Sequence, residues 1–415
     1  MNSSTQSGSG RRAVVTGIGA VTPCGLDVAS TWDCVVAGRS GIRALTGVDV
    51  SDLAVAVGGE VRGFDPLKHV SRSDARRLDR HALYAIAAAE EAMGGFEAEN
   101  PGRFGVTVAT GSGPISLIQD GARALDQSGP RRIPPGVVVY GGPDAAAAYL
   151  SQRYDARGAS VGTAATCASG TVALGDAMRV IRHGYADAVL VVGADDCLNR
   201  VNLAVNSTLG ALAPGFAAEP ERASRPFDRS RSGFVMSAGA AALLVESEQH
   251  ARHRGAVLLG EIAGYGVTSD AYHPTAPRPD GSGAIGAMRA ALDDAAVTAA
   301  EIDHVNAHGT GTPLNDAMEA GALRAVFGPA VASVPVTSTK STTGHLLGAA
   351  GTLEAVICLL AMQDGVIPPT INLDDPEFGE LNVVGNVARE AQLRTVLSNS
   401  FGFGGHNAAL VLRTV

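Results

Sequence analysis

Short apolar runs alternate along the chain with longer segments of amphipathic or small-residue character. Short runs are typical of buried strands, whereas longer segments with apolar residues at helical spacing predict helices. The runs predict strands over 13–16, 188–193, 258–262, 305–307 and 334–337. The longer segments predict helices over 80–93, 168–182, 315–327 and 353–363. This alternation predicts an α/β architecture with short connections.

Two of the predicted helices begin alike. Residues 168–172 and 349–353 each open a helix with small side chains, and the helices end at Gly184 and Gly365. The two starts are offset by 349 − 168 = 181 residues, and so are the two glycines. Chance similarity between Ala/Gly-rich helices is one explanation, and an internal repeat is the other.

Two strand segments, 12–19 and 257–266, both run into a Gly-x-Gly sequence. The first suggests dinucleotide binding, but Thr22 stands where that motif needs its third glycine. No acidic residue ends a second strand at the required distance either. We therefore interpret these glycines as positions of tight packing.

Length and composition indicate a large globular protein. The chain has 415 residues, 46% of them hydrophobic, and a net charge of −9, which excludes disordered and collagen-like classes. With the repeats, this length predicts two related halves, 11–254 and 255–415, after a Ser/Gly-rich tail over 1–10 that we expect to be disordered. The acidic balance argues against nucleic acid as the main partner. We expect no membrane span, because no run approaches about 18 strongly apolar residues.

The cysteines and lysines narrow the chemistry further. Five cysteines without a CxxC pair argue against a disulfide scaffold or structural zinc. The tail lacks an apolar segment typical of a secretory leader, so a reducing, cytoplasmic location is expected. Lys68 and Lys340 are the only lysines, and each is a candidate for chemistry that a guanidinium cannot perform.

Cys167 is the strongest candidate nucleophile. It lies among small residues after a short apolar strand, at the first turn of a predicted helix. Free N–H groups and the positive end of the helix dipole favour a thiolate there and can bind a developing oxyanion. The alternative is an inert buried cysteine, which is our interpretation of Cys34, Cys197 and Cys358.

Two histidines lie in similar loops. His308 follows a predicted strand in the segment HGTGT, and His345 ends the segment STKSTTGH, five residues after Lys340. Ligands bind at the carboxyl ends of strands in open α/β sheets, so these groups and Cys167 are expected to converge. The spacing along the chain matches no zinc motif, so no metal is expected. One cysteine with two histidines indicates acyl chemistry.

These segments resemble the β-ketoacyl-acyl carrier protein synthases, the condensing enzymes of fatty acid and polyketide synthesis. The resemblance runs from RRAVVTG at residue 11 through SRPFD, SDAYHPTAP, HGTGT and STKSTTGH to the FGFGG segment that starts at Phe401. It implies a thiolase-like fold, a duplicated α/β unit in five alternating layers (αβαβα). It also implies no bound cofactor, because the substrates travel on the phosphopantetheine arm of an acyl carrier protein.

The resemblance implies a decarboxylative Claisen condensation. Cys167 would take an acyl group, and the backbone N–H groups of Cys167 and Phe403 would form the first oxyanion hole. His308 and His345 would bind the malonyl thioester and stabilise the enolate. Lys340 would order His345, and its expected ion partners are Glu354 and Asp316.

Further roles follow from the same resemblance. Thr310 and Thr312 match positions that hold the pantetheine arm, Phe401 matches a gate over the acyl pocket, and Asn206 stands where an aromatic residue often lines the acyl region. A basic cluster is the expected docking patch for an acidic carrier protein, although a solvated helix face is the ordinary alternative: Lys68, Arg72, Arg76 and Arg77, with Arg80 beside them. The family dimerises, so a homodimer or a heterodimer with a chain-length factor is expected.

The chain departs from the family pattern at a few positions. Ser232 and Ala238 stand where Asp and Glu are usual, and His406 replaces a common Thr. Three other functions are disfavoured by the residues present. A non-catalytic chain-length factor typically lacks the nucleophile, a thiolase carries a second cysteine, and the shorter initiating synthases use Asn in place of one His. A carrier-dependent elongating synthase is therefore our prediction.

Overall fold

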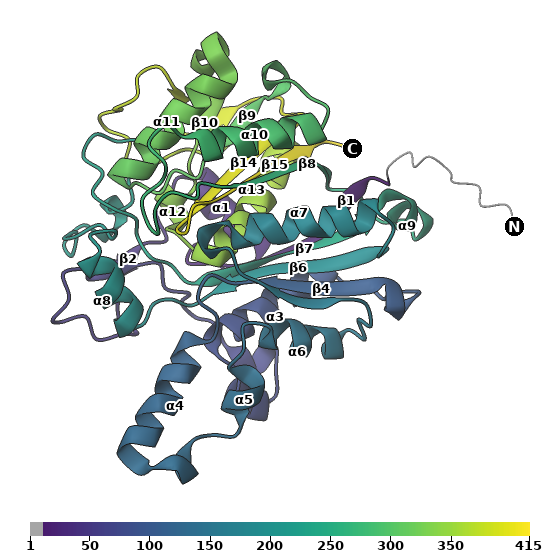
Figure 1. The fold of residues 1–415 in the computed structure, drawn as a ribbon, viewed down its shortest axis with the longest axis vertical. Coiled ribbons are helices and arrows are strands. Elements are labelled where there is room, and N and C mark those ends of the chain that lie inside the picture. Colours follow the sequence, from purple (N-terminus) through teal and green to yellow (C-terminus); the bar gives the residue numbers. More distant parts are fainter. Residues whose placement is uncertain (1–10) are drawn as a thin grey trace, which may run out of the picture.

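The computed structural model describes residues 11–415, and the tail predicted over 1–10 lies outside the described residues (Figure 1). The strands of the first half are β1 (Ala13–Val21), β2 (Arg43–Ala44), β3 (Val57–Gly58), β4 (Phe104–Ala109), β5 (Ser160–Thr163), β6 (Ala188–Asp195) and β7 (Gly239–Ser247). The two-residue strands β2 and β3 pair with each other, outside the main sheet. Those of the second half are β8 (Gly260–Ser269), β9 (His304–Asn306), β10 (Pro335–Thr337), β11 (Val366–Ile367), β12 (Asn382–Val383), β13 (Arg389–Glu390), β14 (Thr395–Gly402) and β15 (His406–Arg413).

The helices divide between the halves in the same way. The first half contains α1 (Val28–Val36), α2 (Arg72–Ala75), α3 (Arg80–Met93), α4 (Ile115–Ser128), α5 (Gly136–Tyr140), α6 (Ala145–Arg153), α7 (Ser169–Arg182), α8 (Arg200–Thr208) and α9 (Glu248–His253). The second contains α10 (Ser282–Asp294), α11 (Pro313–Phe327), α12 (Lys340–Thr343) and α13 (Ala350–Asp364). Each of the nine segments predicted as a helix or a strand contains an element of that kind. The predicted junction at residue 254 falls between α9 and β8.

The strand order repeats between the halves. The main sheet runs β12-β10-β9-β14-β15-β8-β1-β7-β6-β4-β5. The second half contributes one additional edge strand, β12. Without it each half has five strands in this sheet, and numbered within its own half each set has the order 3-2-4-5-1. In each, the third, second and fourth strands are parallel and the fifth is antiparallel to its neighbours. The internal repeat suggested by the sequence is therefore a repeat of topology.

The elements stack in five layers. Helices α3 and α6 cover the outer face of the first half, and α10 with α11 covers that of the second (Figure 1). Helices α7 and α13 lie between the halves, and each packs against strands of both. Three apolar clusters fill the spaces between these layers. This is the αβαβα arrangement of the thiolase-like fold, with the two sheets joined where β1 pairs with β8.

Glycines on the first strand of each half admit the outer helix. A Cβ at Gly17 or Gly19 would lie 1.9 Å from a carbonyl oxygen of α3. A Cβ at Gly264 or Gly266 of β8 would lie 2.2 or 2.0 Å from a carbonyl oxygen of α10. Backbone cannot yield to such contacts, so only glycine permits this packing. The Gly-x-Gly sequences thus serve packing, within strands rather than at turns.

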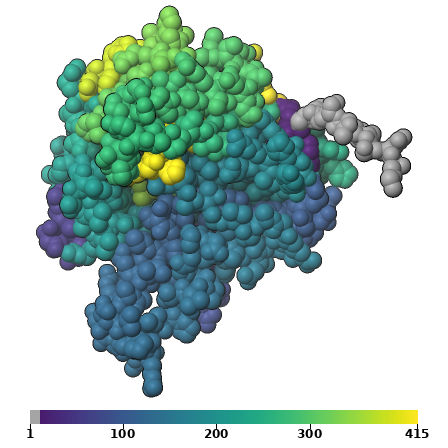
Figure 2. Space-filling view, in the orientation of Figure 1, coloured from purple at the N-terminus to yellow at the C-terminus, as the bar shows by residue number. Residues whose placement is uncertain are grey.

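Helix α13 lies in the centre of the molecule. The segment Leu347–Asp364 is long and apolar enough to cross a membrane by length and composition, but 78% of it is buried inside the fold. A helix apolar on all sides is expected where sheets cover it on both sides. At the far side of the molecule, α4 and α5 project from the main body as an arm (Figures 1 and 2).

Candidate active site

Cys167 lies on a short 3-10 turn, Thr166–Ala168, between β5 and α7. Thr166 adopts a left-handed backbone conformation, with φ of +49°, which is uncommon for a β-branched residue. Its hydroxyl donates a 2.8 Å hydrogen bond to the carbonyl of Phe403, and the Ser169 hydroxyl accepts one of 2.8 Å from the N–H of Ala165. These contacts fix the turn that presents the thiol.

The loop between β14 and β15 packs directly on this turn. A Cβ at Gly402 would lie 2.2 Å from the Thr166 hydroxyl and 3.1 Å from the Cys167 nitrogen. Only glycine allows the two backbones to approach so closely. The backbone N–H groups of Phe403 and Cys167 consequently face the Cys167 sulfur, where both favour its anionic form.

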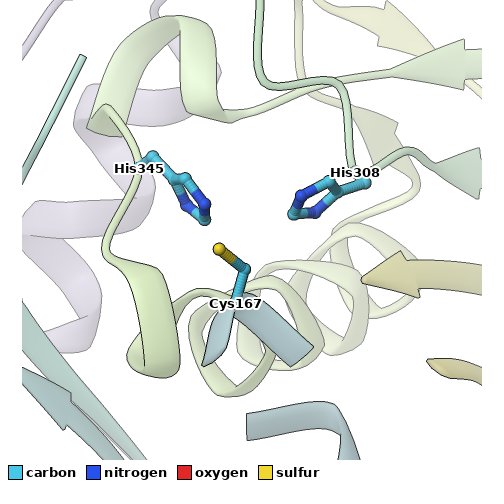
Figure 3. Close-up of side chains that lie close together, drawn as sticks. All are labelled: Cys167, His308 and His345. Carbon is cyan, nitrogen blue, oxygen red and sulfur yellow. The ribbon is translucent and has the colours of Figure 1, made fainter. Parts of the chain in front are cut away.

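Both predicted histidines converge on the thiol (Figure 3). His308 follows β9 and His345 follows α12. The Cys167 sulfur and one ring nitrogen from each histidine all lie within 4.8 Å of one another. The two rings meet edge to face, with centroids 5.4 Å apart, and the ring of Phe401 lies 5.8 Å from that of His308.

Burial changes the expected state of the thiol. Desolvation raises the pKa of Cys167 to about 12, although Lys340 and the N–H groups of Phe403 and Cys167 act in the opposite direction. The N–H groups at the helix start thus favour the thiolate, as expected from the sequence, and burial opposes them. Burial of the sulfur favours the protonated thiol over the thiolate.

The histidines are neutral. Burial lowers the pKa of His308 and of His345 well below the usual value, and the nearby Lys340 lowers both further. Both ring nitrogens of His345 and Nδ1 of His308 are buried without a hydrogen-bond partner among the described residues. Such orphaned groups are costly, and a ligand in the site would satisfy them.

Lys340 lies buried behind the histidines. Its ammonium contacts the carboxylate of Glu354, as expected, and both side chains are almost fully buried. Burial raises the pKa of Glu354 to about 7, while Lys340 holds it down. The expected pair between Lys340 and Asp316 does not form within residues 11–415. Asp316 lies 3.7 Å from Arg231 and accepts hydrogen bonds from the N–H groups of Phe227 and Gly311.

Glu319 is a site residue that the sequence reasoning missed. One carboxylate oxygen accepts a 2.8 Å hydrogen bond from the N–H of His308, and the other accepts one of 2.8 Å from Gly309. Asn399 donates a third bond of 3.2 Å. Glu319 is three residues after Asp316 on α11, and residues at this spacing share a helix face. That spacing was the available signal.

A pocket of about 420 Å³ opens onto the sulfur and both histidines. The predicted substrate-contacting residues all line it: Asn206, Thr310, Thr312, Phe401 and Phe403. The hydroxyls of Thr310 and Thr312 are 3.0 Å apart. The side-chain amide of Asn206 donates to the carbonyl of Asn202. Leu209 and Leu314 also line the pocket, and the sequence reasoning did not single them out.

The Cys-His-His group is also a set of possible metal ligands. The expectation of no metal was based on spacing along the chain, which does not test convergence in space. A closed structural zinc site needs a fourth ligand, and the group contains three donors among the described residues. The expectation of no metal stays a prediction.

The predicted docking residues lie together beside α2. Lys68 ends a 3-10 turn, Arg72 begins α2, and Arg76 caps its end with Arg77 next to it. All four side chains are exposed. Among the ion pairs of residues 11–415, none involves these four cations. The patch is thus basic and unpaired, separate from the pocket.

Comparisons with known proteins agree with this fold and site. The family model described as "Beta-ketoacyl synthase, N-terminal domain" matches residues 10–251, and that of the C-terminal domain matches 259–374. The 3-oxoacyl-[acyl-carrier-protein] synthase 2 of Coxiella burnetii is 40% identical, covering 98% of this chain and 99% of its own. The enzyme of the same name from Vibrio cholerae is 41% identical over 97% of this chain and 99% of its own.

Solved structures add two kinds of neighbour. In the AntDE:AntF complex, a type II polyketide acyl-carrier protein accompanies its ketosynthase bound to the hexaketide. A chain of that structure matches with TM-score 0.91 and 30% identity, and the match covers 98% of this chain and 100% of that one. The ishigamide ketosynthase/chain length factor matches with TM-score 0.89 and 34% identity over the same shares.

A duplicated five-layer fold with a thiol between two imidazoles defines a condensing enzyme of the thiolase-like class. The chain belongs to the β-ketoacyl synthase family. It is a ketosynthase of the acyltransferase class, similar to the 3-oxoacyl-[acyl-carrier-protein] synthase 2 enzymes. The chain-length-factor alternative is not better supported by these relatives.

Proposed function

We propose that this ketosynthase extends an acyl chain held on Cys167 by decarboxylative condensation with a malonyl-carrier protein, in fatty acid or type II polyketide synthesis. The convergence of the Cys167 sulfur with one nitrogen of each histidine, at the floor of an open pocket, carries the proposal. A nucleophile flanked by uncharged hydrogen-bonding groups suits two successive acyl-transfer steps.

The first step loads the acyl group. The Cys167 sulfur attacks the thioester carbon of an acyl chain on the phosphopantetheine arm of a carrier protein, and the carrier thiol leaves with a proton. Because burial raises the pKa of the thiol, a neutral histidine nitrogen would accept its proton during attack. The tetrahedral oxyanion then faces the N–H groups of Cys167 and Phe403.

The second step forms the new carbon–carbon bond. The malonyl thioester loses CO2, and its enolate oxygen accepts hydrogen bonds from His308 and His345, whose neutral rings can donate without a buried charge. The enolate carbon attacks the acyl group on Cys167, and the sulfur leaves. Lys340 and Glu354 would act as a buried pair that positions His345, and Asp316 would support the loop of Gly311.

The residues along the pocket would guide the substrate. Thr310 and Thr312 would hold the pantetheine arm, Phe401 would gate the acyl end beside His308, and Asn206 would contact the growing chain.

Partners and location complete the proposal. The carrier protein would dock on Lys68, Arg72, Arg76 and Arg77, and a second subunit would complete a homodimer or a heterodimer with a chain-length factor. A cytoplasmic location is supported by the five cysteines, all free.

The test replaces the nucleophile. Cys167→Ala should abolish acyl transfer from an acyl-carrier protein, which intact-protein mass spectrometry detects as an added acyl mass. Cys358→Ala, a buried cysteine away from the pocket, is the matched control and should load normally. Condensation that persisted in folded Cys167→Ala would contradict the mechanism.

A further inference from the structure

The reactive side chains of the active site point toward a common centre (Figure 3). The Cys167 sulfur and one ring nitrogen from each of His308 and His345 lie within 4.8 Å of one another. They come from three separate segments, which are the turn before α7, the loop after β9 and the residues after α12. One ion placed between these segments could therefore contact all three atoms.

The spacing of these donors is close to that of a zinc site. Zinc binds sulfur at about 2.3 Å and imidazole nitrogen at about 2.0–2.1 Å in a tetrahedral arrangement, which places neighbouring donors about 3.4–3.6 Å apart. Donors that lie within 4.8 Å of one another reach this separation through movements of about 1 Å, which small side-chain rotations supply. No rearrangement of the fold is needed.

The imidazole nitrogens are available to an ion. Both ring nitrogens of His345 and Nδ1 of His308 are buried without a hydrogen-bond partner among residues 11–415. A neutral imidazole has one N–H group and one nitrogen with a free lone pair, so His345 offers its lone pair in either tautomer. Buried polar groups without partners are costly, and a bound ion would use one nitrogen of each ring.

The fourth coordination position is open. The pocket of about 420 Å³ reaches the sulfur and both rings, so a water molecule can approach an ion from that side. Zinc sites with three protein ligands keep such a position for water or substrate, whereas closed structural sites have four protein ligands. An ion held here would therefore be exchangeable.

The donor set and the nearby charges also bear on which ion fits. A thiolate with two imidazoles suits zinc, whereas magnesium and calcium prefer oxygen ligands. The buried ammonium of Lys340 would repel a dication, but the carboxylate of Glu354 pairs with it. The rings lack the outer-shell hydrogen bonds that strengthen zinc binding about 10- to 100-fold. We therefore expect reversible binding, weaker than that of a structural zinc.

We propose that Cys167, His308 and His345 bind one zinc ion, which blocks the active site reversibly. The thiol releases its proton to solvent as the S–Zn bond forms, each imidazole contributes a lone pair, and water takes the fourth position. No oxidant or reductant takes part, because zinc keeps its oxidation state.

Zinc on the sulfur prevents its attack on a thioester. We therefore expect zinc to inhibit acyl loading, and removal of the ion to restore it. This consequence rests on the proposed function, whereas binding of the ion does not.

The primary test titrates the reduced, metal-free full-length protein with zinc chloride in a calorimeter. We expect one site per chain that Cys167→Ala lacks and that His308→Ala or His345→Ala weakens at least about tenfold. His253→Ala, at an exposed histidine, is the matched control and should bind normally, and magnesium chloride should give no such site. Such a site would correct the expectation of no metal, which rests on spacing along the chain. A site of equal affinity in folded Cys167→Ala overturns the proposal.

Two readouts on the unmodified protein need no variant to fold. Cobalt(II) in place of zinc should give a thiolate-to-cobalt charge-transfer band in the near ultraviolet, which zinc removes. Zinc should slow alkylation of Cys167 by N-ethylmaleimide at least about tenfold, as mapped by peptide mass spectrometry, and EDTA should reverse the effect. Cobalt bound without the charge-transfer band, or alkylation of Cys167 that zinc leaves unchanged, overturns the proposal.

An activity measurement tests the inhibition. Zinc should stop acyl loading of Cys167 from an acyl-carrier protein, as measured by intact mass, and EDTA should restore it. Loading at the normal rate on protein saturated with zinc would overturn the claim that the ion blocks the site. If no loading occurs in EDTA, the proposed function fails, and the titration and the cobalt spectrum still decide the zinc site.

Discussion

At the scale of single residues, the position of His308 depends on a carboxylate that touches only its backbone. Glu319 accepts the N–H groups of His308 and Gly309, one on each oxygen. Burial raises the pKa of Glu319 to about 7, so a substantial fraction is ionised at neutral pH. We therefore expect Glu319 to position His308 for the proposed decarboxylation step.

Glu319→Gln should separate the two half-reactions. The amide has one acceptor oxygen, and its NH2 group would oppose one of the two backbone donors, so the His308 loop must shift. We expect malonyl-carrier decarboxylation to fall about tenfold or more, while acylation of Cys167 stays near normal. Radiolabelled CO2 release and intact mass measure the two steps. Glu97→Gln, at an exposed glutamate, is the control, and equal losses in both steps would contradict the assignment.

The Lys340–Glu354 pair predicts a pH-dependent stability. Burial raises the pKa of Glu354 to about 7, above the usual value of a glutamate, so its ionisation costs stability as pH rises through 7. Lys340 offsets that cost. Lys340→Met should therefore be destabilised by about 3–5 kcal/mol at pH 8.5 and by less at pH 6.

Urea unfolding at the two pH values checks this prediction. Lys340→Met/Glu354→Gln removes both charges and should recover much of the stability with a flatter pH dependence, while condensation stays low. A single variant equally stable at both pH values would show that Glu354 does not titrate as described.

At the scale of elements, α7 and α13 cross where each has a glycine. A Cβ at Gly170 would lie 2.7 Å from the backbone nitrogen of Thr352, and one at Gly351 would lie 2.6 Å from that of Thr171. These are the equivalent positions of the sequence repeat. The close crossing brings together the starts of both helices, next to Cys167 and His345.

Gly170→Ala should disturb this crossing. The added methyl meets backbone atoms that cannot rotate away, so we expect a loss of about 1–3 kcal/mol in unfolding free energy, with slower acylation. Gly321→Ala on α11 is the control, because its Cβ would meet only the end of the Arg324 side chain at 3.7 Å. That variant should be neutral or more stable by up to about 1 kcal/mol. Chemical denaturation compares the two, and equal stabilities would contradict the packing argument.

Sequence patterns predicted the elements better than their contacts. The helix over 80–93 and the paired starts at 168 and 349 were visible because periodicity and small residues are local signals. The raised pKa of the Cys167 thiol could not be predicted, because desolvation of the sulfur depends on all the layers packed around it.

At the scale of the whole molecule, the basic patch beside α2 predicts how the carrier protein is recruited. Charges on an exposed patch act through screened, long-range attraction. Arg76→Glu/Arg77→Glu should raise the KM for malonyl-carrier protein about tenfold at low salt, and the effect should shrink at high salt.

Two controls isolate docking from catalysis. A pantetheine thioester without the carrier should be used equally by the variant and the unmodified protein. Arg289→Glu/Arg394→Glu, with the same charge change on the other half, should keep the normal KM. Salt-dependent turnover that is unchanged in Arg76→Glu/Arg77→Glu would exclude this patch as the docking site.

The repeated strand order means that the two halves supply equivalent loops to the active site. If the site were instead formed by a dimer of two identical half-length chains, each chain would contribute the same loop to it. Here the loop after the third strand supplies a thiol in the first half and an imidazole in the second. Joining both units in one chain allows nucleophile and hydrogen-bond donor to be specialised separately, which identical subunits cannot achieve.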